Sequence, residues 1–84
     1  MLVQLPYPEI RALMAKYGVT TKIVAGIIGA SRQTVWSKLN NKSEFYFTEM
    51  LKLRAYFINL GASPAEVTID RLFFEWNPYY SKEA

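Results

Sequence analysis

Apolar side chains recur at helical spacing near the start of the chain. Pro8 suits the first turn of a helix there, and Gly18 suits its end because glycine adopts the left-handed conformation without steric cost. The i, i+3, i+4, i+7 pattern typical of a helix with one buried face is formed by Ile10, Leu13, Met14 and Tyr17. The pattern predicts a helix that begins near residue 8 and packs this stripe into a core.

The segment from Thr20 to Lys42 reads as two short helices joined by a tight turn. Val24, Ala25 and Ile28 fall on one helical face, and they predict a first helix over about residues 21–28. One face of this helix is therefore expected to be buried.

A glycine and a serine separate the two helices. Gly29 suits a left-handed helix end, and Ser31 is a good N-cap for a second helix that begins at Arg32. Val35 and Leu39 lie four residues apart on one side of that helix. Polar residues that cannot all face a core occupy other positions: Arg32, Gln33, Ser37 and Lys38.

The second half of the chain predicts two further helices. Thr48 is expected to cap a helix that Gly61 ends, and Phe45 and Phe47 in the preceding linker are expected to turn onto the core. Apolar residues surround more than one face of this fourth helix, as in the central helix of a bundle: Met50, Leu51, Leu53, Phe57, Ile58 and Leu60. A fifth helix is expected because an N-cap, a proline and a capping-box glutamate follow in order: Ser63, Pro64 and Glu66.

Four features follow one another in the two-helix segment: the small residue Ala25, the turn glycine Gly29, the cap Ser31 and a polar second helix from Arg32. This ordered set resembles the helix-turn-helix of phage repressor and Cro-type regulators. The resemblance spans roughly residues 8–74, since the first helix and TEMLKLRAYFINLG look like the family's first and fourth helices. It implies an all-α, five-helix, lambda-repressor-like DNA-binding domain whose second and third helices form the motif. Residues 1–84 would form this single domain, with an aromatic C-terminal tail at 75–84.

Positive charge is concentrated on the same segment. The net charge of the chain is +3, but six basic and no acidic residues lie between Ile10 and Ser43. The remaining residues carry four basic and seven acidic groups. This is the charge distribution expected of a surface that meets phosphate, the alternative being cations that only solubilise a helix face. Arg11 and Lys16 lie off the first helix's apolar stripe and are expected to face water or, as a weaker alternative, the DNA backbone.

An α-helix fits the major groove of duplex DNA, and the residues near its N-terminus come closest to the base edges. The residues expected to read bases are Arg32, Gln33, Thr34 and Ser37. The residues expected to contact the DNA backbone are Thr21, Lys22, Ser31, Lys38, Asn40 and Lys42. Trp36 is expected to pack on a neighbouring helix, with contact to thymine methyl groups and sugar as the alternative.

Three positions depart from the pattern of the family that the chain resembles. Ile23 and Ile27 occupy positions that are usually polar, and Lys38 stands three residues after Val35, where an aliphatic residue is usually buried. A second interpretation keeps the fold but uses Ile23 and Ile27, or the C-terminal aromatic residues, to bind and inhibit another regulator. Two further alternatives are a helical hairpin in a bundle that binds nothing and a subunit of a larger phage assembly.

The C-terminal part carries more apolar area than one small core is expected to hide. Because large apolar patches on a soluble monomer usually mark an interface, six residues are predicted to form a dimer or partner interface. They are Leu72, Phe73, Phe74, Trp76, Tyr79 and Tyr80. The resemblance implies a homodimer on a near-palindromic DNA operator. The alternative is a tail that folds back to complete the core.

Residue types that support catalysis and metal binding are scarce. The chain has no histidine and no cysteine, and its seven acidic residues form no DxD or ExxE pair. We therefore expect no enzymatic activity, no metal and no cofactor.

No apolar run approaches the length of a membrane span, and the first residues lack the charged region of a signal peptide. These features favour a cytoplasmic protein, and the resemblance implies a nucleoid-associated protein in a bacterial cell, with a phage or mobile element as its setting.

Overall fold

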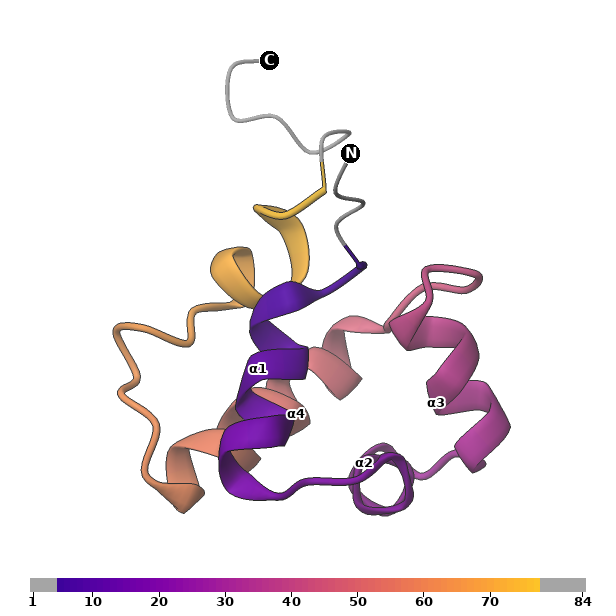
Figure 1. The fold of residues 1–84 in the computed structure, drawn as a ribbon, viewed down its shortest axis with the longest axis horizontal. Helices are drawn as coiled ribbons and strands as arrows, with labels where there is room; N and C mark the ends of the chain where they lie inside the picture. Colours follow the sequence, from indigo (N-terminus) through magenta and orange to yellow (C-terminus); the bar gives the residue numbers. More distant parts are fainter. Residues whose placement is uncertain (1–4, 78–84) are drawn as a thin grey trace.

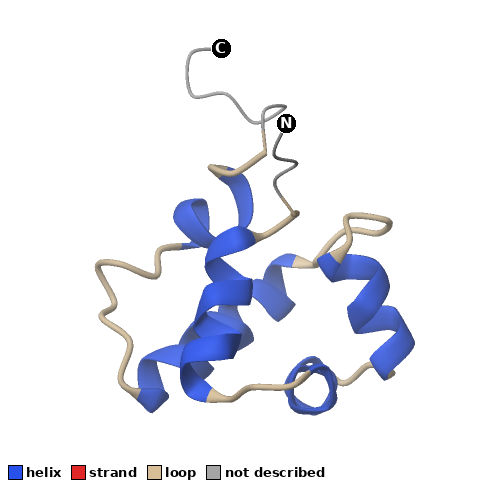
Figure 2. Cartoon of the chain, in the orientation of Figure 1, coloured by secondary structure: helices blue, strands red, loops and turns tan. Residues whose placement is uncertain are grey.

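The computed structural model of the protein describes residues 5–77. Their secondary structure is entirely helical, with no strand among them (Figures 1 and 2). The elements are α1 (Pro8–Tyr17), α2 (Thr21–Ile28), α3 (Arg32–Leu39), α4 (Phe47–Leu60) and a short π-helix, η1 (Asp70–Phe74). The predicted all-α class is therefore confirmed. Within the described range, no helix has the length and apolar content needed to cross a membrane.

The first helix begins and ends as its residues predict. Pro8 occupies its first turn, and Gly18 ends it in the left-handed conformation with φ 66°. Tyr7, which precedes the helix, is itself left-handed with φ 54°, and its ring is buried. The start of α1 is thus fixed by a buried aromatic side chain as well as by the proline.

The turn between α2 and α3 also follows the prediction. Gly29 ends α2 with φ 71°, and the Ala30 amide donates to the Ala25 carbonyl at 2.9 Å. The Ser31 hydroxyl accepts a hydrogen bond from the Thr34 amide at 3.1 Å, which caps α3. These two local devices set the direction in which α3 leaves α2.

The core forms where the helices meet around α4. The helix α2 packs against both α3 and α4, and η1 packs against α1, as the ribbon in Figure 1 shows. The largest fully buried side chains come from every helical element: Ile10, Val24, Val35, Leu53, Phe57 and Leu72. The two sides of α3 therefore differ in solvent exposure, because Val35 and Leu39 on one side are buried in this core.

The start of α4 differs from the prediction. The helix begins at Phe47 and not after Thr48, because the Glu49 carboxylate accepts a hydrogen bond from the Tyr46 amide at 2.9 Å and so caps the helix earlier. Phe45 is buried as predicted. The predicted inward turn of Phe47 is wrong, since it lies on the first turn with its side chain facing outward, 62% exposed.

The predicted helix from Ser63 is also wrong. The amides of Glu66 and Val67 both donate to the Ser63 carbonyl, at 2.9 and 3.1 Å, and form a turn. Arg54 of α4 then donates to the carbonyls of Pro64 and Val67, at 3.1 and 2.8 Å. The arginine thus joins this segment to α4. The last helical element, η1, starts only at Asp70.

Candidate nucleic-acid interface

The outer surface of α3 carries the residues that the sequence singled out. Arg32 and Gln33 are exposed at its N-terminal end, whereas Val35 in the next turn is fully buried. Thr34 and Ser37 are half-buried. A helix anchored by its inner face thus presents a guanidinium and a carboxamide to the outside, both able to form paired hydrogen bonds.

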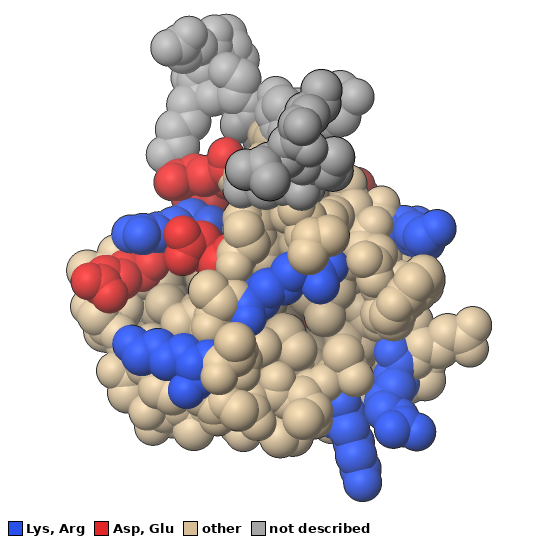
Figure 3. Space-filling model, in the orientation of Figure 1, with Lys and Arg blue, Asp and Glu red and all other residues tan. Residues whose placement is uncertain are grey.

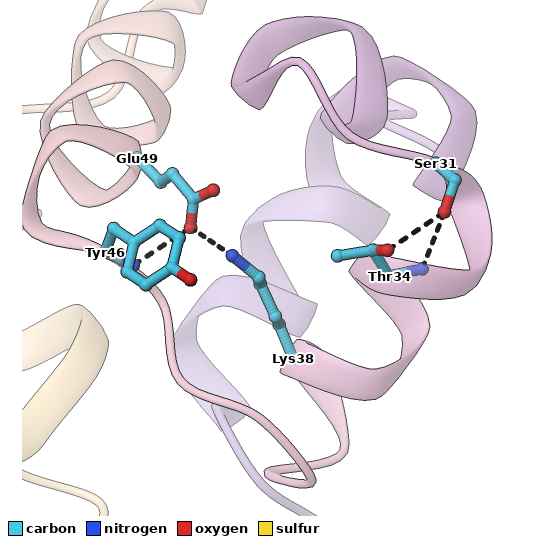
Figure 4. Close-up of polar contacts among 5 residues, drawn as sticks. All are labelled: Ser31, Thr34, Lys38, Tyr46 and Glu49. Atoms are coloured by element: carbon cyan, nitrogen blue, oxygen red, sulfur yellow. Dashed lines mark hydrogen bonds and ion pairs between the residues drawn. The ribbon is translucent and has the colours of Figure 1, made fainter.

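The two hydroxyl groups at the start of α3 bond to each other. Ser31 donates from its hydroxyl to the hydroxyl of Thr34 at 3.0 Å, in addition to accepting the Thr34 amide (Figure 4). Both groups therefore have a structural role in capping. Ser31 remains exposed, so its oxygen is accessible from outside the protein.

The tryptophan in the middle of α3 faces outward. Trp36 is 53% exposed, so the expected packing on a neighbouring helix is wrong. The Nζ of Lys42 lies 5.7 Å from the centre of its ring. Together, Trp36 and Lys42 place an aromatic ring and a positive charge beside Gln33 and Arg32 on the exposed part of α3.

Lys38 is not on this surface, and its predicted contact with the DNA backbone is wrong. Its side chain is only 6% exposed and its Nζ lies 2.5 Å from Glu49 Oε1 at the start of α4. The ring of Tyr46 covers the ammonium, with its centre 4.3 Å away (Figure 4). The reason is the spacing noted in the sequence, because a residue three after Val35 lies on the buried side of the helix. Lys38 therefore joins α3 to α4.

The loop after α3 is shaped by two asparagines. Asn41 adopts the left-handed conformation with φ 59°. The Lys42 amide donates a hydrogen bond to the Ser37 carbonyl at 2.8 Å. The side chain of Asn40 donates to the Trp36 carbonyl at 2.9 Å. Asn40 thus acts mainly within the helix end, whereas Lys42 is exposed.

Three exposed cations lie on α2, on α3 and in the loop after α3. Lys22 on α2, Arg32 and Lys42 form no ion pair with any described residue. Thr21, beside Lys22, is half-buried. In Figure 3, basic side chains project from the side of the molecule that α2 and α3 occupy, while the acidic ones visible on this face lie mainly over the segment after α4.

The cationic surface is smaller than the count of basic residues indicated. Lys38 is buried in its ion pair with Glu49, and Arg11 is half-buried and hydrogen-bonded to protein carbonyls. The expectation that Arg11 faces water or the DNA backbone is therefore wrong. Lys16 is exposed as expected. The internal role of Arg11 carried no signal in the sequence, since its partners lie on other segments of the chain.

The isoleucines of α2 leave only a small apolar surface. Ile23 is 37% exposed, whereas Ile27 is half-buried and packs against the core. Of the two isoleucines that the sequence offered as an apolar surface for a protein partner, mainly Ile23 is thus accessible.

The predicted C-terminal interface is wrong for its first two residues. Leu72 and Phe73 are buried, and the Phe73 ring lies 5.4 Å from that of Phe45. Phe74 and Trp76 are half-buried, and the Trp76 ring lies 4.7 Å from the Tyr7 ring. The segment after α4 therefore folds back to complete the core. Tyr79 and Tyr80 lie outside the described residues.

No protein-family model, curated protein or solved structure matches the chain. The function is therefore argued from the geometry of the site: an exposed polar start of α3, exposed cations on α2, on α3 and in the loop after α3, and a buried side that holds α3 against α4.

Proposed function

We propose that the protein binds duplex DNA sequence-specifically and regulates transcription in the manner of phage repressor and Cro-type proteins. In this proposal, α2 and α3 form a helix-turn-helix. The observation that carries it is the exposure of Arg32 and Gln33 at the N-terminal end of a helix whose other side is buried. This is the end of a recognition helix that lies nearest the bases.

The exposed side chains have the chemistry for reading base edges. Arg32 can donate two parallel hydrogen bonds to guanine O6 and N7, and Gln33 can pair in the same way with adenine N6 and N7. Trp36 offers an apolar surface to thymine methyl groups. Lys22 and Lys42 lie on either side of α3 in the chain and supply charge for phosphate contacts, which position the protein without reading sequence.

Regulation in this proposal occurs by occupancy of an operator. A homodimer would bind two half-sites about one turn of DNA apart, because a two-fold protein matches a two-fold site. Bound near a promoter, it would block or recruit polymerase. The resemblance to phage repressors suggests a phage or mobile element as the setting.

Selection from a random duplex library at two salt concentrations tests the proposal. We expect enrichment of one near-palindromic sequence, with affinity that falls as salt rises because bound cations are released from DNA. A parallel selection with Arg32→Ala and Gln33→Ala should lose preference at separate base positions. Absence of any enriched sequence for the unchanged protein would contradict sequence-specific binding.

A second candidate function is supported by the exposed apolar side chains near the same surface. Ile23 and Trp36 are 37% and 53% exposed, so a protein partner could bind there and the chain could inhibit another regulator. Ile23→Asp separates the two functions. It should abolish binding of a protein partner, whereas sequence preference in the duplex selection should persist if DNA is the ligand.

A further inference from the structure

Arg11 links three separate parts of the molecule. It lies on α1, and its Nε donates to the Pro6 carbonyl at 2.6 Å. Its Nη2 donates to the Leu39 carbonyl at 2.8 Å and to Asn40 Oδ1 at 3.3 Å. One guanidinium therefore joins the segment before α1, α1 itself and the C-terminal end of α3.

The contact with α3 is made where that helix needs a partner. Leu39 is the last residue of α3, and carbonyls in the last turn of a helix have no amide partner within the helix. A cation is also favourable there, because the helix dipole places partial negative charge at the C-terminus. Asn40 extends the contact, since its own side chain donates to the Trp36 carbonyl. Arg11 thus holds the last turn of α3 at two points.

We propose that Arg11 is a positioning residue for DNA reading: it sets the angle at which α3 presents Arg32 and Gln33, without touching DNA. This inference rests on the proposed function. An eight-residue helix is about 12 Å long, so a tilt of about 10° about its C-terminal end shifts the other end by about 2 Å. Binding groups must be held to about 0.5 Å of their working geometry, so a small tilt is enough to disturb base reading.

The role requires an arginine. Its planar group has five N–H donors, and these reach acceptors on two segments at once, whereas the ammonium of lysine is a single centre on a flexible stem. On the other side of the helix, Lys38 and Glu49 hold α3 to α4. The orientation of α3 is therefore fixed from α1 by Arg11 and from α4 by an ion pair.

The binding experiment compares Arg11→Gln and Arg11→Lys with the unchanged protein, on the selected duplex and on a scrambled duplex over a salt series. We expect the ratio of specific to non-specific affinity to fall about tenfold in both variants. The salt dependence should stay the same, because no phosphate contact is lost. Lys16→Gln is the matched control: Lys16 is an exposed cation on the same helix, and its removal should leave the ratio unchanged.

A phosphate contact by Arg11 would give a different result. Both affinities would then fall together, and the salt dependence would decrease by about one ion. That outcome, or full rescue of the affinity ratio by Arg11→Lys, would overturn the positioning role.

Amide hydrogen exchange supplies a readout that needs no DNA. The amides of Asn40, Asn41 and Lys42 donate to carbonyls in α3, so Arg11→Gln should speed their exchange while the amides around Leu53 in α4 stay protected. Unchanged exchange at these three amides would overturn the role of Arg11. Failure of the unchanged protein to bind any duplex, with faster exchange in the variant, would instead overturn the proposed function alone.

Discussion

Two exposed cations of the candidate interface should have different effects on binding. Arg32 lies at the N-terminal end of α3, where side chains approach base edges, while Lys42 lies in the loop after the helix. Arg32→Ala should cost about 1–3 kcal/mol of discrimination at one base position, whereas Lys42→Ala should weaken binding to all sequences and reduce the salt dependence by about one ion. Titrations of matched and singly mismatched duplexes over a salt series measure both effects. Equal losses on every duplex for Arg32→Ala would contradict base reading by this residue.

Two glycines of the α2 region should respond oppositely to alanine. Gly26 lies inside α2, and a Cβ there would meet no atom within 4 Å. Gly26→Ala should therefore raise the free energy of unfolding by about 0.5–1 kcal/mol. Gly29 has equal space but a φ of 71°, so Gly29→Ala should lower it by about 1–2 kcal/mol. Urea denaturation of the two variants measures these changes, and a stabilising Gly29→Ala would show that the turn is not left-handed.

Single residues also show where sequence reasoning about the site worked. The exposure of Gln33 could be predicted because helical periodicity places it opposite Val35, whereas Arg32, three residues before Val35, is exposed as the first residue of the helix. The same periodicity places Lys38 near Val35, but the charge of a lysine favours the surface. Its burial depends on Glu49, eleven residues away, so the ion pair could be found only with the structure.

At the scale of elements, the pair Lys38–Glu49 should stabilise the contact between α3 and α4. Lys38→Met should destabilise the protein by about 3 kcal/mol, because it leaves the Glu49 carboxylate buried without its cation. Adding Glu49→Gln should recover part of the loss, since glutamine is neutral and can still accept the Tyr46 amide. Chemical denaturation of the single and double variants measures this difference. A Lys38→Met variant as stable as the unchanged protein would contradict a structural role for the pair.

The helices of the N-terminal half were predictable with their ends. In the C-terminal half, α4 and its end at Gly61 were predictable, whereas its start and the position of the last helical element were not. Signals such as Pro8, Gly18 and Ser31 act within their own turn, so they can be read directly from the sequence. The Ser63–Pro64 signal is equally strong, but the segment is instead joined to α4 by Arg54, which donates to the carbonyls of Pro64 and Val67. A contact between segments thus outweighed a local preference, and the sequence pattern contains no trace of it.

At the scale of the whole molecule, the burial of Phe73 changes what a substitution there should do. Phe73→Ala should lower the free energy of unfolding by about 3–5 kcal/mol, as expected for a large core side chain. Phe47→Ala is the matched control, because Phe47 is an exposed aromatic residue and its loss should have a small effect. Denaturation with light scattering measures stability and oligomeric state together. If Phe73→Ala left the stability unchanged but altered the oligomeric state, Phe73 would be an interface residue and not a core residue.

The burial of Leu72 and Phe73 also bears on how the protein is made in the cell. Translation proceeds from the N-terminus, so α2 and α3 are synthesised before these two residues have been joined to the chain. Until then, Tyr7 and Phe45 lack the aromatic ring that covers them. We therefore expect the nascent chain to reach its final packing only once residue 73 has emerged, so that a translation product interrupted after α4 stays incompletely folded and is open to proteolysis.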